Sequence, residues 1–411
     1  MDQHKLYRTI HSLAEQKFRT DDQFLNYILE SIIKIEEIPI KGGRIWKLEP
    51  AAGTYRIIKQ HGEMEHIRKK FRLRILDYPM FAQLARKGGS MLATETNKYL
   101  RQRGIRTYAA AGVGELIRWK GHDLYPYVIA INGDYLKNEM TYALNIIGNA
   151  VTTSLKSRRI EHKAQQLAED LDKARDIQKS ILPEHELHFH NYDLYGISLP
   201  DRVVGGDFFD YLQASDEKDR LGVVIGDAAS KGLSAAAQAL YVSGALRMGI
   251  EYQTKTGAFI GKINKLVNRT FSAEHFISMV YVELTSSDNG LVFYVNAGHN
   301  NPIMLRSNPD EVEMFPATGQ LLGPFPNEKY ASEFTLMKKA DILLLHTDGI
   351  TDASNENREM YGQRRLISQL REHRTKTPRE ICQIILEDVQ KFNKLVEFSD
   401  DKTLVVIKRT T

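Results

Sequence analysis

Residues 221–236 read LGVVIGDAASKGLSAA. The apolar run before Asp227 is typical of a buried strand, and the longer pattern that follows it, residues 233–250, is typical of a helix. A carboxylate therefore stands where a buried strand meets solvent and the chain turns towards a helix. Glycine on its N-terminal side lets backbone or substrate approach closely.

The same arrangement recurs on both sides of this stretch. Asp207 follows a glycine pair, Asp348 follows the apolar run 342–345, and Asp400 and Asp401 directly precede the run 403–408. Further strand patterns at 277–284 and 291–296 alternate with helical patterns at 257–270 and 378–395, which predicts an α+β fold for residues 190–411. Each aspartate alone is more typical of a turn or a solvated strand end, and only the whole set in this order favours a shared site.

Several carboxylates at one sheet edge repel each other unless cations neutralise them. Oxygen ligands without histidine or cysteine suit Mg²⁺ or Mn²⁺. Two such ions about 3.5–4 Å apart activate a water and steady a phosphoryl group during in-line attack. The pattern therefore predicts hydrolysis of a phosphate ester.

Five ordered motifs resemble the metal-dependent protein phosphatase 2C family, in its SpoIIE-like bacterial branch. They are VGGDFFD at 204–210, GDAASKGLSAA at 226–236, NAGHNNP at 296–302, TDGITDA at 347–353 and DDKTLVV at 400–406. The resemblance covers residues 190–411 and implies an αββα sandwich. It also implies two Mn²⁺ or Mg²⁺ ions and activity on phosphoserine or phosphothreonine in a protein.

By this resemblance, the metal ligands and catalytic residues are Asp207, Asp227, Asp348 and Asp400. The carbonyl of Ala228 is a further ligand, and Asp401 is the alternative to Asp400. Asp210 and Asp352 are acidic positions of the same motifs that support the ligands or hold a third ion. One departure is Ser230, where the branch has a glycine.

Three other side chains of this half have two interpretations each. His299 is either a general acid or a residue that holds a turn by hydrogen bonds, and we favour the turn. Lys231 and Arg202 either contact phosphate or are solvated surface residues.

Residues 1–150 combine predicted helices at 6–18, 24–36 and 135–157 with a hairpin of 44–50 and 54–59 and a strand at 123–132. This order resembles a GAF-type sensory domain, which implies a small-molecule or protein signal. Trp46 and the tyrosines at 125–127 are candidates to line a ligand pocket, although we expect core packing for them by default. This half carries 24 Lys and Arg against 16 Asp and Glu, which we interpret as a solvated surface rather than a nucleic-acid site.

Residues 151–185 are predicted to form a coiled-coil linker helix and a homodimer. Apolar residues recur there with spacings of four and three, at Ile160, Ala164, Leu167, Leu171 and Ala174, and Pro183 ends the helix. The alternative is one amphipathic helix that packs on its own domain.

Composition narrows the class of protein. No stretch of the sequence has the ~18 consecutive apolar residues that a membrane helix needs. The N-terminus lacks the pattern of a secretory signal. The chain has a single cysteine, Cys382, which excludes an internal disulfide and a cysteine-based zinc site. We expect this residue to be buried in a helix, and we expect the protein to be cytoplasmic.

The sequence thus predicts a bacterial signalling phosphatase that acts on a phosphorylated regulator such as an anti-sigma-factor antagonist. Two alternatives are a catalytically silent phosphatase fold that senses or scaffolds, and a nucleotide phosphodiesterase with the same two-metal chemistry.

Overall fold

The computed structural model describes residues 18, 20–34, 40–63, 65–252, 255–272, 274–308, 311–394 and 400–410. The chain divides into two compact units, residues 1–166 and 167–411. Each unit has its own sheets and its own hydrophobic clusters, so each is a separate domain.

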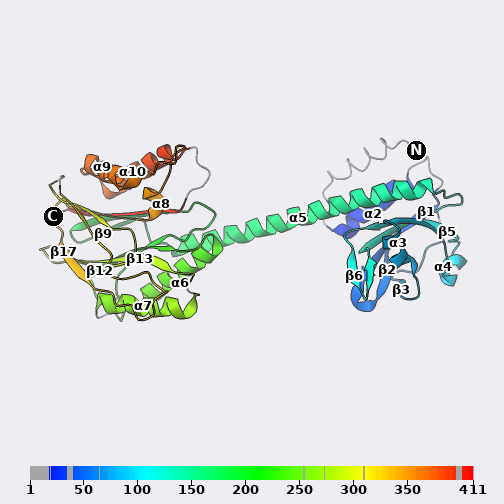
Figure 1. Ribbon diagram of the computed structural model, residues 1–411, viewed down its shortest axis with the longest axis horizontal. Helices are drawn as coiled ribbons and strands as arrows, with labels where there is room; N and C mark the ends of the chain where they lie inside the picture. The colour runs from blue at the N-terminus through cyan, green and yellow to red at the C-terminus, as the bar shows by residue number, and fades with distance from the viewer. Residues whose placement is uncertain are drawn as a thin grey trace. The chain divides into compact units, whose positions relative to one another are not determined.

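The N-terminal domain is built on one six-stranded antiparallel sheet in the order β3-β2-β1-β8-β5-β4 (Figure 1). Helix α2 and the first part of α5 cover one face with apolar side chains, and α3 and α4 cover the other. The elements are α2 (Asp21–Ile33), β1 (Gly42–Glu49), β2 (Thr54–Gly62), β3 (Arg72–Arg74), α3 (Met80–Arg86), β4 (Ser90–Thr94), α4 (Lys98–Gln102), β5 (Thr107–Val113), β8 (Tyr127–Asn132) and α5 (Glu139–Ile181), with a separate small ribbon of β6 (Ile117–Trp119) and β7 (His122–Leu124).

The predicted hairpin is confirmed as β1 and β2, joined by a short 3₁₀ turn at Pro50–Ala52. Gly53 closes that turn with φ of 63°, a conformation that favours glycine. The predicted strand 123–132 is interrupted, because β7 ends at Leu124 and β8 begins at Tyr127. The predicted helix at 6–18 lies outside the described residues except for its last position, and the likeness to a GAF domain stays a prediction.

One continuous helix, α5, replaces the two helical segments expected at 135–157 and 151–185. It ends at Ile181, two residues before Pro183. This end is expected, because a proline disfavours the helical conformation of the residue before it. Its first part buries Leu144, Ile147 and Val151 against the N-terminal sheet.

The C-terminal domain consists of two antiparallel sheets packed face to face (Figure 1). The first has the order β16-β15-β18-β19-β10-β9, and the second has the order β11-β12-β13-β14-β17. Their strands are β9 (Glu186–Phe189), β10 (Tyr192–Leu199), β11 (Phe208–Leu212), β12 (Arg220–Ala228), β13 (Ile277–Thr285), β14 (Leu291–Ala297), β15 (Ile303–Leu305), β16 (Val312–Met314), β17 (Glu333–Leu336), β18 (Ile342–His346) and β19 (Lys402–Arg409).

Alternation along β13 shows how the layers form. Val280 and Val282 face the other sheet, whereas Met279 and Tyr281 face the helices, because successive side chains of a strand point to opposite faces. Helices α6 (Leu233–Ile250) and α7 (Thr256–Thr270) cover the outer face of the second sheet, and α9 (Gly362–Glu372) and α10 (Pro378–Phe392) cover the first. The predicted αββα sandwich is therefore observed.

One smaller prediction, on the single cysteine, is also confirmed by this domain. Cys382 is fully buried in α10, where burial raises the pKa of its thiol. Among the described residues, no helix has the length and apolar content needed to cross a bilayer.

Candidate active site

Strand ends position the aspartates that the sequence singled out. Asp207 lies directly before β11, and Asp227 lies at the end of its neighbour β12. In the other sheet, Asp348 begins the short helix α8 (Asp348–Thr351) after β18, and Asp400 comes just before the adjacent β19. Each sheet of the sandwich thus contributes carboxylates from two adjacent strands.

The electrostatics show that these carboxylates converge. Burial and the negative charge of Asp227 raise the pKa of Asp207. Burial and the charges of Asp348, Asp400 and Asp401 raise the pKa of Asp227 to about 7. Burial and Asp400 also raise the pKa of Asp348. Mutual repulsion of this kind is relieved when cations bind between the carboxylates.

Asp400 and Asp401 have different surroundings. The Asp401 carboxylate accepts hydrogen bonds from the backbone amides of Asp201 (2.8 Å) and Gly206 (2.6 Å), so it holds the loop before β11. The Asp400 side chain is half exposed and lies 3.4 Å from the Lys231 ammonium. Asp400 is therefore the more exposed of the two carboxylates, and Asp401 holds the backbone of the neighbouring loop.

The position of Asp401 requires glycine at two places in the motifs. A Cβ at Gly205 would lie 2.4 Å from its carboxylate oxygen, and a Cβ at Gly349 would lie 1.9 Å from its carbonyl oxygen. Real Cβ atoms do not approach other atoms so closely, so both positions exclude a side chain while Asp401 is in place. Asp401 thus joins the loop of Asp207 to the loop of Asp348.

Two further residues hold the site and were not predicted from the sequence. The Thr347 hydroxyl donates to the Asp207 carboxylate (2.7 Å) and accepts from the Thr403 amide (3.0 Å). The Gln178 side chain, near the end of α5, is hydrogen-bonded to both backbone groups of Gly205. The position of Thr347 inside the TDG motif was a usable signal, whereas no local pattern marks Gln178.

A cleft of about 760 Å³, including its mouth, is lined by Asp348 and Asp400, whereas Asp207 and Asp227 are not among its lining residues. Arg202 and Lys231 bring positive charge to its lining beside Asp348 and Asp400, which is the setting that a phosphate group requires. The lining residues are Asp201, Arg202, Lys231, Asp348, Gly349, Asp352, Ala353, Ser354, Asn393 and Asp400.

The donor set fits hard divalent cations that keep part of their water shell. Among the described residues, no group of three or more acidic, histidine or cysteine side chains is arranged so that it could hold a metal ion by itself. Mg²⁺ in proteins is commonly held by one or two carboxylates with waters and substrate oxygens. The carbonyl oxygen of Ala228 faces Gly206, 3.1 Å from where a Cβ would lie, so glycine keeps that side of the oxygen open.

The other two acidic motif positions differ in their roles. Asp210 is buried, and its carboxylate accepts hydrogen bonds from Arg247 (2.6 Å) and Ser243 (3.1 Å) of α6. It therefore joins β11 to α6 and is engaged away from the cleft. Asp352 lines the cleft, and its charge contributes to the raised pKa of Asp348.

His299 has the structural surroundings that we favoured. It is buried, its amide donates to the Asn296 side chain (2.8 Å), and its Nδ1 lies 2.7 Å from the Ser278 hydroxyl. Burial lowers the pKa of His299 to about 3, so the ring is neutral at pH 7 and has no acidic proton to give a leaving group.

Ser230 does not disturb the loop after β12. The residue with left-handed backbone there is Gly232, with φ of 67°, and Ser230 is not among the non-glycine residues with positive φ. The Ser230 hydroxyl accepts a hydrogen bond from Gln238 of α6 (2.6 Å), which ties the loop to the helix.

Comparisons with known proteins agree with this geometry. The family model described as Stage II sporulation protein E (SpoIIE) matches residues 217–410, a range that includes Asp227, Asp348 and Asp400. Protein IcfG of Synechocystis sp. (strain ATCC 27184 / PCC 6803 / Kazusa) is 26% identical over 268 residues, which are 58% of this chain and 41% of IcfG. Phosphoserine phosphatase RsbU of Bacillus subtilis (strain 168) is 24% identical over 247 residues, 60% of this chain and 71% of RsbU.

A solved structure shows the same fold. The SiaA-PP2C domain of Pseudomonas aeruginosa superposes with a TM-score of 0.53 at 20% identity, over 60% of this chain and 98% of that domain. The match to the family model falls on the part of the chain that carries Asp227, Asp348 and Asp400. The comparisons therefore identify the C-terminal part of the chain as a SpoIIE-family PP2C phosphatase domain.

Proposed function

We propose that this chain is a metal-dependent protein phosphatase that hydrolyses phosphoserine or phosphothreonine. The observation that carries the proposal is the mutual repulsion of Asp207, Asp227, Asp348 and Asp400 at one end of the sandwich. Such a cluster is stable at neutral pH when divalent cations bind to it.

The proposed roles rest on the resemblance to the phosphatase family and on the electrostatics of the aspartates. Asp207, Asp227, Asp348 and Asp400 hold two Mn²⁺ or Mg²⁺ ions, and the Ala228 carbonyl completes the set. When bound, such ions lower the pKa of a water and neutralise charge on the phosphoryl oxygens. Thr347 orients the Asp207 carboxylate through its 2.7 Å hydrogen bond.

The positive residues of the cleft bind the substrate in this proposal. Arg202 presents a planar guanidinium suited to two phosphate oxygens, and Lys231 presents a point charge beside Asp400. Because His299 is neutral and buried, the leaving serine or threonine oxygen takes its proton from water.

The substrate class in this proposal is a phosphorylated regulatory protein, such as an anti-sigma-factor antagonist. The resemblance to the SpoIIE-like branch supports it, as does the likeness to RsbU, which is named a phosphoserine phosphatase. The cleft is open and has charged walls, which suits a side chain presented on the surface of another protein.

A homodimer formed through α5, and a cytoplasmic site of action, are parts of the same proposal. Three of the apolar residues in the second half of α5 are largely exposed: Ile160 (58%), Leu167 (62%) and Ile177 (56%). Apolar side chains at these spacings are buried when two such helices pair, and a helix continuous with both domains would carry a signal between them.

Hydrolysis of a chromogenic aryl phosphate by the full chain, with Mn²⁺ and with a chelator, tests the activity. We expect activity that needs the metal and disappears in Asp227→Ala, while Asp216→Ala, at an exposed acid in the turn before β12, keeps it. Absence of turnover in every metal, for the full chain and for residues 190–411, would favour the catalytically silent alternative.

A further inference from the structure

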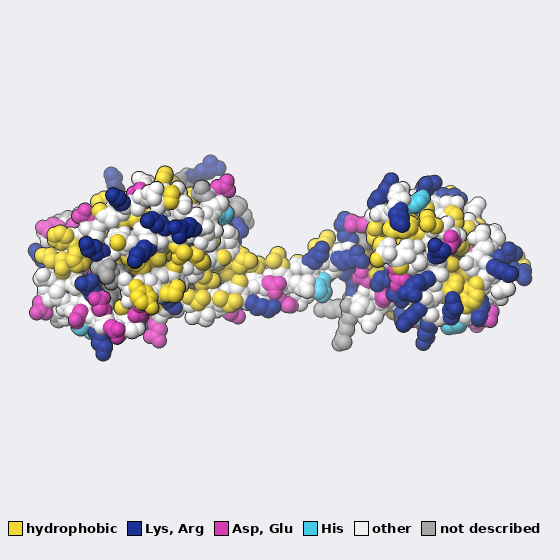
Figure 2. Space-filling model, turned by 90° about the horizontal axis from the view of Figure 1, so that it is seen from below, with side chains coloured by type: hydrophobic (Ala, Val, Ile, Leu, Met, Phe, Trp, Pro, Cys, Tyr) yellow, Lys and Arg dark blue, Asp and Glu magenta, His cyan; other side chains and the backbone are white. Residues whose placement is uncertain are grey.

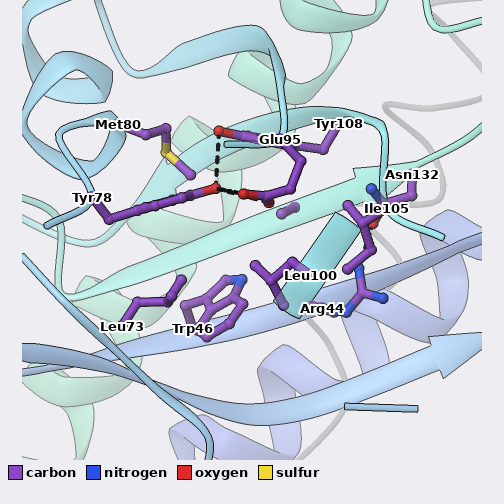
Figure 3. Close-up of a pocket in the computed structure, with 11 residues that line it drawn as sticks. Arg44, Trp46, Leu73, Tyr78, Met80, Glu95, Leu100, Ile105, Tyr108 and Asn132 are labelled. Carbon is purple, nitrogen blue, oxygen red and sulfur yellow. Dashed lines mark hydrogen bonds between the residues drawn. The ribbon is translucent and has the colours of Figure 1, made fainter. Parts of the chain in front are cut away.

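Figure 3 shows a buried carboxylate of the N-terminal domain whose hydrogen bonds come from neighbouring residues. Glu95 accepts from the Tyr78 hydroxyl (2.9 Å) and from the Asn97 amide (2.7 Å). Trp46 lines the same cavity, but the free space inside is about 20 Å³, which is the room of about one water molecule. These residues therefore pack the core of the domain and leave no room there for an organic ligand.

A buried polar side chain of a different kind lies on helix α6 of the C-terminal domain. Gln238 is 1% exposed, and its amide nitrogen donates to the Ser230 hydroxyl (2.6 Å) and to the Ser234 carbonyl (3.1 Å). Its amide oxygen is also buried, and among the described residues no donor lies within hydrogen-bond distance of it. A buried carbonyl without a partner destabilises a fold, so packing alone does not explain a glutamine at this position.

The partner of Gln238 lies in the turn that joins β12 to α6. The Ser230 amide donates to the Ala228 carbonyl (2.6 Å), so the backbone of this turn is fixed at its first residues. Gly232 ends the turn with φ of 67°, a conformation that favours glycine. Through the Ser230 hydroxyl, Gln238 therefore holds the middle of the turn against the helix that follows it.

The residue between Ser230 and Gly232 is Lys231, whose side chain lines the cleft. Its ammonium group lies 3.4 Å from the Asp400 carboxylate, and its side chain is 64% exposed. An exposed lysine loses conformational freedom when it binds an anion, and this loss weakens the binding. A fixed backbone below Lys231 reduces the loss, because the side chain then starts from one position beside the cleft.

We propose that Gln238 is a positioning residue for the phosphoryl group of the substrate. Its hydrogen bond to Ser230 fixes the backbone from which Lys231 reaches the cleft, and this raises the affinity of the site for phosphate. The inference rests on the proposed function, because it requires Lys231 to contact phosphate. Ser230 stands where the SpoIIE-like branch has a glycine, so this hydrogen bond is a feature of the present chain and not of the shared motif.

Gln238→Met separates positioning from stability. The variant keeps nearly the same side-chain volume and removes the unpaired oxygen, and water can reach the half-buried Ser230 hydroxyl in place of the amide. We expect a melting temperature that is unchanged or higher, together with binding of inorganic phosphate that is about threefold to tenfold weaker. Isothermal titration calorimetry of the full chain, with Mg²⁺ in the buffer, measures the Kd. A merely structural role predicts the reverse, a lower melting temperature and an unaltered Kd.

Lys231→Met tests whether Gln238 acts through the lysine. We expect this variant to bind phosphate at least about tenfold more weakly, since it loses a charged hydrogen bond. Adding Gln238→Met to it should weaken the binding no further, because the two residues act on the same contact. Ser230→Ala removes the other partner of the hydrogen bond and should match Gln238→Met. Losses that add up in the double variant, or unaltered phosphate binding in Lys231→Met, would overturn the proposal.

Ser243→Ala is the matched control on the same helix. It removes a buried hydrogen bond, from Ser243 to Asp210 (3.1 Å), that lies away from the cleft, so it should lower the melting temperature and leave the phosphate Kd unchanged. If Gln238→Met and Ser230→Ala bind phosphate as tightly as the wild type while Lys231→Met does not, the inference is wrong and the proposed function stands. Absence of saturable phosphate binding by the wild-type chain would overturn both.

Discussion

The side chain of Gln178 is hydrogen-bonded to both backbone groups of Gly205. Its amide nitrogen donates to the Gly205 carbonyl (2.7 Å), and its amide oxygen accepts from the Gly205 amide (3.2 Å). Gly205 lies two residues before Asp207, and Gln178 lies in the last turn of α5. The helix that leaves the N-terminal domain therefore ends on the loop that carries a proposed metal ligand.

We expect Gln178→Ala to raise the Mn²⁺ concentration needed for half-maximal activity by about tenfold. The variant leaves two buried backbone groups without their side-chain partner, and loss of such support for metal ligands typically costs 10–100-fold in metal affinity. A Mn²⁺ titration of aryl phosphate hydrolysis measures it. Lys179→Ala, at an exposed position on the same helix, is the control, and an unaltered Mn²⁺ requirement in Gln178→Ala would contradict the coupling.

Asp400→Asn and Asp401→Asn should fail in different ways. Asp400 is a proposed ligand, so its variant should lose more than about a hundredfold in metal-dependent activity with little change in stability. Asp401 accepts from the amides of Asp201 and Gly206, so its variant should lower the free energy of unfolding by about 1–3 kcal/mol.

Urea unfolding and aryl phosphate hydrolysis, measured on both variants, separate the two effects. The reverse assignment, with Asp401→Asn stable but inactive and Asp400→Asn unstable, would identify Asp401 as the ligand. That outcome would require the loop before β11 to rearrange.

Ile160→Asn with Leu167→Asn should convert a dimer into a monomer. Both side chains are largely exposed on α5, and pairing of two helices would bury them. Analytical ultracentrifugation measures the mass, and Glu161→Asn with Lys163→Asn, at exposed flanking positions, is the control. A wild-type chain that is monomeric at all accessible concentrations would refute the dimer.

Stability of the C-terminal domain should fall on acidification because of His299. Its pKa is lowered from 6.5 to about 3 in the folded state, so the unfolded state binds the proton more readily. The contribution of neutral His299 to the free energy of unfolding is therefore complete above about pH 6.5. It is lost as the pH falls, and the loss reaches about 2 kcal/mol at about pH 5. Hydrogen exchange of β13 and β14 amides measures it, and His299→Gln should flatten the pH dependence. An equally steep dependence in that variant would show that other groups cause it.

Part of the C-terminal domain could be predicted because its signals are local. The apolar run that ends at Asp227 and the run that ends before Asp348 identify both a strand and a carboxylate at its end. Their convergence follows from the two-sheet architecture that the motifs imply. The αββα sandwich and the family were predicted for the same reason.

The remaining features depend on contacts between distant parts of the chain. Sequence spacing could not distinguish Asp400 from Asp401, because the difference lies in amides about two hundred positions earlier. Gln178 is one of several polar residues on a charged helix, and only its hydrogen bond to the Gly205 backbone distinguishes it from the others. Arg44 looked like an ordinary strand residue, and its burial beside Asn132 appears only when β1 pairs with β8.

Figure 2 shows a further feature without a local signal, a gathering of hydrophobic side chains on the face formed by α6 and α7. The exposed members on and just after α6 include Leu233, Met248 and Tyr252. The same helix binds Asp210 through Arg247, whose guanidinium also donates to the Ile181 carbonyl at the end of α5. Helix α6 thus contacts both β11 and the linker.

The place of β19 in its sheet has a consequence for biosynthesis. This strand follows every other element of the C-terminal domain in the chain, yet it lies between β18 and β10, and it begins beside Asp400 and Asp401. A nascent chain still on the ribosome without β19 has neither the centre of the first sheet nor the residue that joins the two aspartate loops. The aspartate site is therefore incomplete until the last strand has been synthesised, and by then the whole N-terminal domain has already left the ribosome.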